Sequence, residues 1–221
     1  MLTGDLTYQA IPSLKLTDKV YQALQLMADN QTLHLAVIDT DDKYLGLVSE
    51  EMLLSVENDD NDLQSLQHTL LPASVKADEF FFKALQLVTD HDLSIAPVID
   101  QENYLLGVVT HIDLLRQLAD FNGIHQPGGV IVLEIESLQY SFSEISKIVE
   151  QNDAQITQLN SSTHPDTGLT LITVRLNKME ISDIIASFQR YEYTIKYYFG
   201  EEIYENELKS NYDNLMNYLS I

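Results

Sequence analysis

Thr110 and Asp113 are the two residues of this chain whose types and spacing best suit binding chemistry. They lie in the segment Gly107-Val108-Val109-Thr110-His111-Ile112-Asp113, at the expected start of a helix. A threonine hydroxyl there can donate to an anion, beside the first N–H groups of the helix, which also favour negative charge. Asp113 follows one turn later on the same face, where its carboxylate can accept hydroxyl groups. The structural alternative is that Thr110 is an N-cap and Asp113 a first-turn acid that suits the helix dipole.

This segment belongs to a unit that occurs twice. Ala23-Leu24-Gln25-Leu26 recurs as Ala84-Leu85-Gln86-Leu87, and Leu45-Gly46-Leu47-Val48-Ser49 recurs as Leu106-Gly107-Val108-Val109-Thr110. Both pairs are offset by 61 residues, without a gap. Self-similarity at one period indicates a duplicated structural unit that buries its apolar face against its copy. What the copies share is mostly core, so function must be sought where they differ.

Each copy predicts a helix, two strands and a second helix. The first helix has apolar residues at spacings of three and four. The strands are short apolar runs joined by an acidic turn, at Leu35–Ile38 and Tyr44–Val48 in one copy and Ile95–Ile99 and Leu105–Val109 in the other. The second helices begin at Ser49 and Thr110, residue types that favour an N-cap.

This unit resembles a CBS domain, and its duplication resembles the CBS pair that packs into one module. The resemblance covers about residues 5–120 and rests on Ser-Ile-Ala-Pro-Val-Ile-Asp before the second hairpin and Gly-Val-Val-Thr-His-Ile-Asp after it. It implies a regulatory role and an adenosine-containing ligand, such as AMP, ADP, ATP or another adenosyl compound, in a cleft between the repeats.

The same resemblance implies roles for single residues. Gly107–Asp113 is similar to the family's nucleotide signature, Gly-x-x-Thr/Ser-x-x-Asp, which implies that Thr110 contacts an α-phosphate and Asp113 a ribose. Ser94, Ile95 and Pro97 stand where the family lines the adenine pocket.

The first copy departs from this pattern. Met52 stands where the second copy has Asp113, Leu33 replaces Ser94, and Ala36 replaces Pro97. A thioether is a weak acceptor for ribose hydroxyls. We therefore predict one nucleotide site per chain, in the second copy.

Beyond the boundary at Gly123–Gly129 the pattern changes. Strands are predicted at Val130–Glu136, Gln155–Leu159, Leu169–Leu176 and Thr194–Phe199, with a polar connection from Asn160 to Gly168. Ser141 and Glu144 form a potential capping box for a helix that buries Ile145, Ile148 and Val149, and a second helix covers 180–191. The order βαββαβ is that of a ferredoxin-like sandwich.

After a CBS pair, this half resembles an ACT domain, and the combined layout is similar to that of acetoin-utilisation B-like regulators. ACT ligand sites commonly have a glycine in the first strand-to-helix turn, whereas Glu136–Tyr140 contains none. We therefore predict that this half does not bind a free amino acid by that route and instead serves subunit pairing.

The expected fold class is α/β (α+β), with two βαββα-type repeats, a βαββαβ domain and a C-terminal helix. The domains are residues 1–125 for the pair, with repeats at about 5–60 and 66–122, then 128–200 for the ACT-like domain and 201–221 for the helix. The helix carries one apolar stripe, made by Tyr204, Leu208, Tyr212, Leu215 and Leu219. This stripe docks either on its own chain or on a second subunit.

Composition narrows the partners. The net charge of −22 disfavours nucleic acid and anionic membranes as partners. The absence of cysteine excludes disulfides and thiolate metal sites. No apolar run approaches the roughly 18 residues of a membrane span, and the N-terminus lacks the basic start and long apolar run of a signal peptide. We found no catalytic or metal-binding constellation. We therefore expect a cytoplasmic, homodimeric, non-enzymatic regulatory protein that has no resident cofactor. The alternative is a ligand-free oligomerisation and interaction scaffold.

Overall fold

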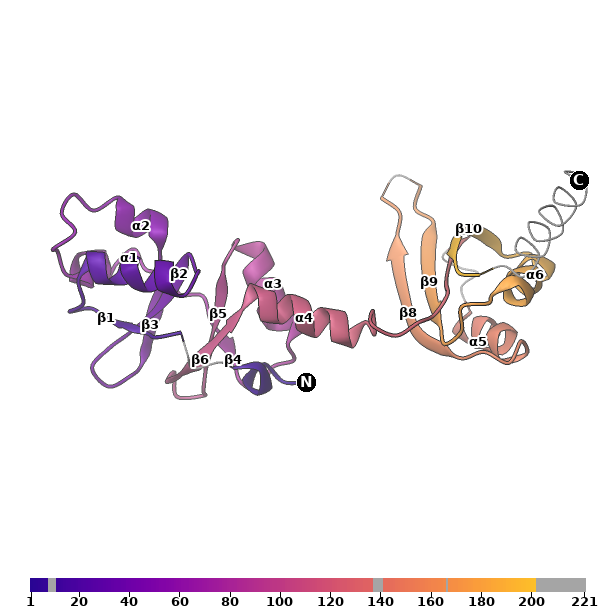
Figure 1. The fold of residues 1–221 in the computed structure, drawn as a ribbon, viewed down its shortest axis with the longest axis horizontal. Helices are drawn as coiled ribbons and strands as arrows, with labels where there is room; N and C mark the ends of the chain where they lie inside the picture. The colour runs from indigo at the N-terminus through magenta and orange to yellow at the C-terminus, as the bar shows by residue number, and fades with distance from the viewer. Residues whose placement is uncertain (8–10, 137–140, 166, 202–221) are drawn as a thin grey trace, which may run out of the picture. The chain divides into compact units, whose positions relative to one another are not determined.

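The computed structural model describes residues 1–7, 11–136, 141–165 and 167–201. Two compact units make up the chain, Met1–Leu118 and Ala119–Ile221 (Figure 1). Apart from Glu201, the predicted C-terminal helix lies outside the described residues.

The first unit contains the two copies in order. After a short 3-10 helix, η1 (Thr3–Leu6), the first copy runs through β1 (Leu14–Lys15), α1 (Val20–Asp29), β2 (His34–Ile38), β3 (Tyr44–Ser49) and α2 (Glu50–Leu54). A second 3-10 helix, η2 (Leu63–Leu66), precedes β4 (Val75–Lys76), α3 (Phe82–Asp90), β5 (Ile95–Ile99), β6 (Leu105–Thr110) and α4 (His111–Phe121). The predicted βαββα repeats are therefore present, and the four strands with predicted ranges, β2, β3, β5 and β6, lie within one residue of their expected bounds.

Each copy forms its own three-stranded sheet, in the order β1-β2-β3 and β4-β5-β6. The first pair of strands is parallel and the second antiparallel in both sheets. Leu14 pairs with Val37 in one sheet, and the equivalent Val75 pairs with Val98 in the other. The duplication seen in the sequence thus extends to strand register.

The cores explain why these segments form these elements. Val20, Ala23 and Met27 lie on one face of α1 and are buried, as the spacing of three and four predicts. Both β2 and β5 are buried along almost their whole length, which their continuous apolar sequences require. Tyr44 and Leu47 of the first copy belong to the core cluster of the second copy, so the repeats share buried surface.

The second unit is a four-stranded antiparallel sheet with helices on one face. Its elements are β7 (Val130–Ile135), α5 (Phe142–Glu150), β8 (Ile156–Thr163), β9 (Thr170–Leu176), α6 (Ser182–Arg190) and β10 (Thr194–Phe199). The strand order is β10-β7-β9-β8. Alternate strand residues, such as Ile131 and Val174, pack with Ile145 of α5 and Phe188 of α6 in one core. The predicted ferredoxin-like order is confirmed.

One local prediction was wrong, and a second is confirmed only in part. Asn160–Thr163 continues strand β8 and does not begin a loop, because these residues pair with Thr170–Thr173 while their polar side chains stay exposed on an edge strand. The capping box is only half formed. Glu144 N–H donates to Ser141 Oγ at 3.4 Å, but the Glu144 carboxylate accepts from the hydroxyl of Tyr193 at 2.5 Å.

Candidate functional site

Thr110 ends β6 immediately before α4 and caps this helix. Its Oγ1 accepts the N–H of Asp113 at 3.1 Å, which satisfies one of the first-turn donors of α4. The hydroxyl also donates to Asp113 Oδ2 at 2.6 Å. The structure therefore brings the two predicted residues together in one hydrogen-bonded pair, half-buried at the surface.

The Asp113 carboxylate is engaged but not saturated. Its other oxygen, Oδ1, accepts from Arg116 Nη1 at 2.9 Å. A carboxylate offers about four lone-pair sites, so each oxygen retains capacity for a further donor. The Thr110 hydroxyl can rotate away from Asp113 toward another acceptor. The pair can therefore serve a ligand that presents hydroxyl donors and an anionic acceptor.

The Ser94 side chain contacts the first copy. Its Oγ lies 2.8 Å from Thr32 Oγ1 and 3.0 Å from His34 Nδ1, and it accepts the N–H of Leu33 at 3.1 Å. Ser94 and Thr32 are both buried. The Ser94 hydroxyl is thus part of a polar contact between the copies, and its backbone carbonyl accepts from His111, which opens α4, at 3.0 Å.

Ile95 and Pro97 are both buried in β5. Ile95 pairs in register with Thr110 across the β5–β6 ladder, so it lies beside the motif. Its side chain belongs to the core and leaves only its backbone available to a ligand. Pro97 pairs with Val108, further from α4 along the same strands.

The first copy has the same helix cap without the carboxylate. Met52 N–H donates to Ser49 Oγ at 3.2 Å, as Asp113 N–H does to Thr110. Ser49 therefore has a structural role that is independent of any ligand. At this cap, the copies differ in the side chain at Met52 and Asp113, as the sequence comparison indicated.

Thr32 and His34 are residues that the sequence analysis missed. Burial lowers the pKa of the His34 imidazole, and its Nδ1 accepts the N–H of Ser94 at 3.2 Å. The repeat held one signal for these two residues. Leu33 is the equivalent of Ser94 in the first copy, and Thr32 and His34 are its neighbours in the sequence. Their contact across 60 residues depends on how the copies pack, which no local pattern shows.

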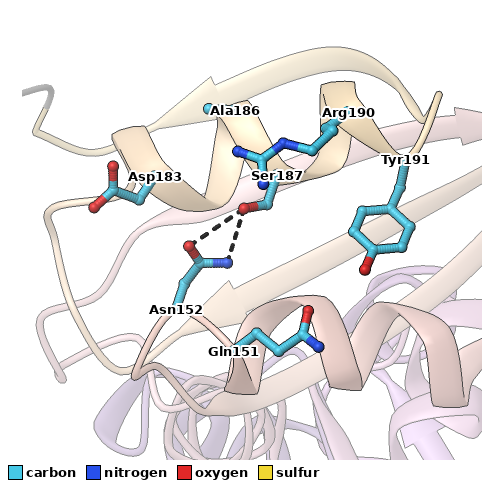
Figure 2. Close-up of a pocket in the computed structure, with 7 residues that line it drawn as sticks. All are labelled: Gln151, Asn152, Asp183, Ala186, Ser187, Arg190 and Tyr191. Carbon is cyan, nitrogen blue, oxygen red and sulfur yellow. Dashed lines mark hydrogen bonds between the residues drawn. The ribbon is translucent and has the colours of Figure 1, made fainter.

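The second unit has a polar hollow of about 350 Å³ between the end of α5 and helix α6. Figure 2 shows Asn152 and Ser187 facing each other across it. Asn152 Nδ2 donates to Ser187 Oγ at 3.1 Å, and Lys178 Nζ donates to the Asn152 carbonyl at 2.8 Å. These bonds brace the helices.

The first strand-to-helix turn, where the ACT comparison predicts no amino-acid binding, falls largely at residues 137–140, outside the described part.

Within residues 1–7, 11–136, 141–165 and 167–201, no group of three or more histidine or carboxylate side chains is arranged to hold a metal ion. No helix in these same ranges is both long and apolar enough to cross a membrane.

Comparison with known proteins identifies the first unit. Residues 4–59 and 72–120 match the family described as CBS domain. A solved CBS domain pair/ACT domain protein from Thermotoga maritima aligns with 55% of this chain and 98% of its own, at 27% identity and a TM-score of 0.50. A putative acetoin utilization protein from Vibrio cholerae aligns with 57% of this chain and 95% of its own, at 19% identity and a TM-score of 0.48.

Curated relatives match through the same region. A homoserine O-acetyltransferase from Methanohalobium evestigatum is 26% identical over 119 residues, which are 53% of this chain and 24% of the relative. This chain thus spans about a quarter of that relative's length. The predicted resemblance to a CBS pair with an ACT-like domain is confirmed, and the match to an enzyme is confined to part of that enzyme.

Proposed function

Because residues 4–59 and 72–120 form a CBS domain pair, a regulatory module, we propose that this protein senses an adenosine-containing nucleotide or derivative. The ligand binds at the motif of the second copy, where Asp113 accepts the ribose hydroxyls and Thr110 donates to a phosphate. The observation that carries the proposal is the Thr110–Asp113 pair, at 2.6 Å and half-buried, which the first copy lacks.

Charge favours some adenosyl ligands over others. Arg116, which is exposed, already pairs with Asp113, and the chain as a whole carries a net charge of −22. A triphosphate would meet little neutralising charge at such a surface. A monophosphate, or an uncharged or cationic adenosyl compound such as S-adenosylmethionine, suits the site better.

Calorimetry on the full chain tests this with AMP, ADP, ATP, NAD and S-adenosylmethionine. We expect one site per chain. Losing a hydrogen bond to a charged group costs about 1.5–3 kcal/mol, so Asp113→Ala should weaken binding by about tenfold to a hundredfold. Undiminished affinity in this variant, or two sites per chain, would contradict the proposal.

The two copies supply a matched control. Thr110→Ala and Ser49→Ala remove the same N-cap bond, at 3.1 and 3.2 Å respectively, so each should lower stability by about 0.5–2 kcal/mol. Only Thr110→Ala should also weaken ligand binding. If no adenosyl compound binds the wild-type chain or raises its melting temperature, the ligand-free scaffold is the better description.

We further propose that the ACT-like domain pairs two subunits in a homodimer. Strand β10 is an edge of its sheet, and Tyr197 and Phe199 on it are 55% and 65% exposed. An edge strand with exposed aromatic side chains is suited to association with another chain. Sedimentation equilibrium should show a dimer that Tyr197→Ser with Phe199→Ser weakens, while monomeric wild-type protein would refute the pairing.

A further inference from the structure

Histidine rings from both copies contact the backbone of Ser94. On one side, the Ser94 N–H donates to His34 Nδ1 at 3.2 Å. On the other side, the Ser94 carbonyl accepts from the His111 backbone N–H at 3.0 Å and lies 2.9 Å from His111 Nδ1. His34 begins β2 of the first copy, and His111 follows Thr110 at the start of α4. Ser94 therefore connects the first copy to the nucleotide motif of the second.

The two contacts require opposite protonation at Nδ1. A ring nitrogen that accepts an N–H must be unprotonated, whereas one that bonds a carbonyl oxygen must carry a proton. His34 is therefore neutral with its proton on Nε2. His111 carries a proton on Nδ1, because its partner is a carbonyl oxygen. A proton on Nδ1 is thus part of the contact at His111, whereas at His34 it would replace the bond from the Ser94 N–H with a bond to the Ser94 hydroxyl oxygen.

The surroundings of His34 hold this arrangement in place. The Ser94 hydroxyl packs against Thr32, and the Thr32 hydroxyl donates to the His34 carbonyl at 3.1 Å. Burial is the cause of the lowered pKa of His34. Titratable side chains on the adjoining elements are Asp29 at the end of α1, Glu50 and Glu51 on α2, His91 and Asp92 before β5, and His111 and Asp113 on α4.

We propose that a proton on His34 weakens ligand binding at Thr110 and Asp113. The first copy, which has Met52 in place of Asp113, thereby regulates the second copy. This regulation rests on the function proposed above. A protonated Nδ1 would donate to the Ser94 hydroxyl oxygen, 3.0 Å away, and would place its proton against the Ser94 N–H. The lost contact with the N–H would shift the Ser94 backbone, whose carbonyl holds His111 beside Thr110. Only the neutral fraction of His34 is competent, so the dissociation constant should rise about tenfold for each pH unit below its pKa.

The test is calorimetry on the full chain from about pH 5 to about pH 8, the range in which histidines titrate, with AMP and S-adenosylmethionine as probes. His34→Asn retains an acceptor oxygen near the Nδ1 position but cannot take up the proton. The phosphate of AMP also titrates, near pH 6, so the quantity to compare is the ratio of wild-type to His34→Asn dissociation constants. His91→Asn is the matched control, because His91 is an exposed histidine of the same unit.

We expect a ratio near one at neutral pH that rises about tenfold per pH unit once His34 is protonated, and an unchanged wild-type profile in His91→Asn. NMR titration of the ring should show that ligand lowers the pKa of His34 further, since coupling is reciprocal. A ratio of one at every pH, with AMP or S-adenosylmethionine still bound, would overturn the regulation alone. So would a pH dependence that persists in His34→Asn and disappears in His111→Asn. Failure of both probes to bind at any pH would instead overturn the proposed function, and the regulation with it.

Discussion

Tyr44 and Asn103 bond each other reciprocally across the two copies. The Tyr44 N–H donates to the Asn103 carbonyl at 2.9 Å, and Asn103 Nδ2 donates back to the Tyr44 carbonyl at 2.8 Å. Beside them Lys43 and Tyr104, equivalent positions in the two copies, form an antiparallel bridge. The tips of the two hairpins are therefore joined by contacts between equivalent positions, as a local twofold axis would relate them. These contacts hold the two copies together.

Asn103→Asp should destabilise the first unit by about 1–3 kcal/mol. The change replaces the Nδ2 donor with an oxygen that faces the Tyr44 carbonyl, and the loss of a partner in such a bond has a cost of this size. Asparagine and aspartate both tolerate the left-handed backbone at this position, where φ is 72°, so backbone strain does not confound the result. Chemical denaturation is the measurement.

Asp42→Asn is the control for this substitution, because Asp42 is the equivalent residue and has a φ of 62°. Its carboxylate lies 3.8 Å from Lys15 in an exposed pair, so its replacement should change stability by less than about 0.5 kcal/mol. Equal effects from both variants would show that the Asn103 side-chain bond contributes little.

Tyr44→Phe should lower stability by about 0.5–1.5 kcal/mol at neutral pH. The buried Tyr44 hydroxyl donates to the Ala73 carbonyl at 2.6 Å. Burial also raises the pKa of this phenol above its usual range. The stabilisation is therefore complete below the unfolded pKa of about 10 and is lost as pH rises above it.

Denaturation at neutral and alkaline pH checks both parts of this prediction. The Phe variant should lose less stability than the wild type as pH rises past about 10. Tyr21→Phe is a suitable control, since Tyr21 is 45% exposed. Parallel alkaline curves for wild type and Tyr44→Phe would mean that another group carries the transition.

Gly46→Ala should destabilise the first unit by about 2–5 kcal/mol, the combined scale of backbone strain and overpacking. Gly46 has a φ of 157°, and a Cβ there would lie 2.8 Å from Leu70 Cβ and 3.1 Å from the Leu71 carbonyl. Gly168 has a φ of 68°, and a Cβ added there would have no atom within 4 Å. Gly168→Ala therefore reports backbone strain alone and should lower stability by about 1–2 kcal/mol. Thermal unfolding of both variants separates backbone strain from the steric clash of the added Cβ. Equal losses of stability in the two variants would rule out a steric contribution at Gly46.

The apolar stripe of residues 204–219 predicts an effect of truncation. A helix of this length is marginal in water by itself, so the stripe should dock, and we expect it to do so on a second subunit. Because protein that ends at Gly200 keeps strand β10 but loses the stripe, it should dimerise more weakly, and its light-scattering mass should fall from that of the full-length dimer toward that of a monomer. A folded truncated protein of unchanged oligomeric state would show that the segment docks on its own chain.

The order of elements could be read from the sequence because it depends on local pattern. The 61-residue offset between copies and the alternating apolar residues of β7 and β9 indicate which segments become strands and which become helices. The contrast between Asp113 and Met52 was visible for the same reason, since equivalent positions in a repeat can be compared directly.

Contacts between distant segments were decided by tertiary packing. The Ser94 hydroxyl meets Thr32 and the Ser94 N–H meets His34, 60 residues away, contacts that the sequence did not predict. Strand β8 continues through polar Asn160–Thr163 because β9 offers backbone partners there. A hydrogen bond to a remote neighbour leaves no periodic signal in either segment, so only the folded chain shows which of these groups meet.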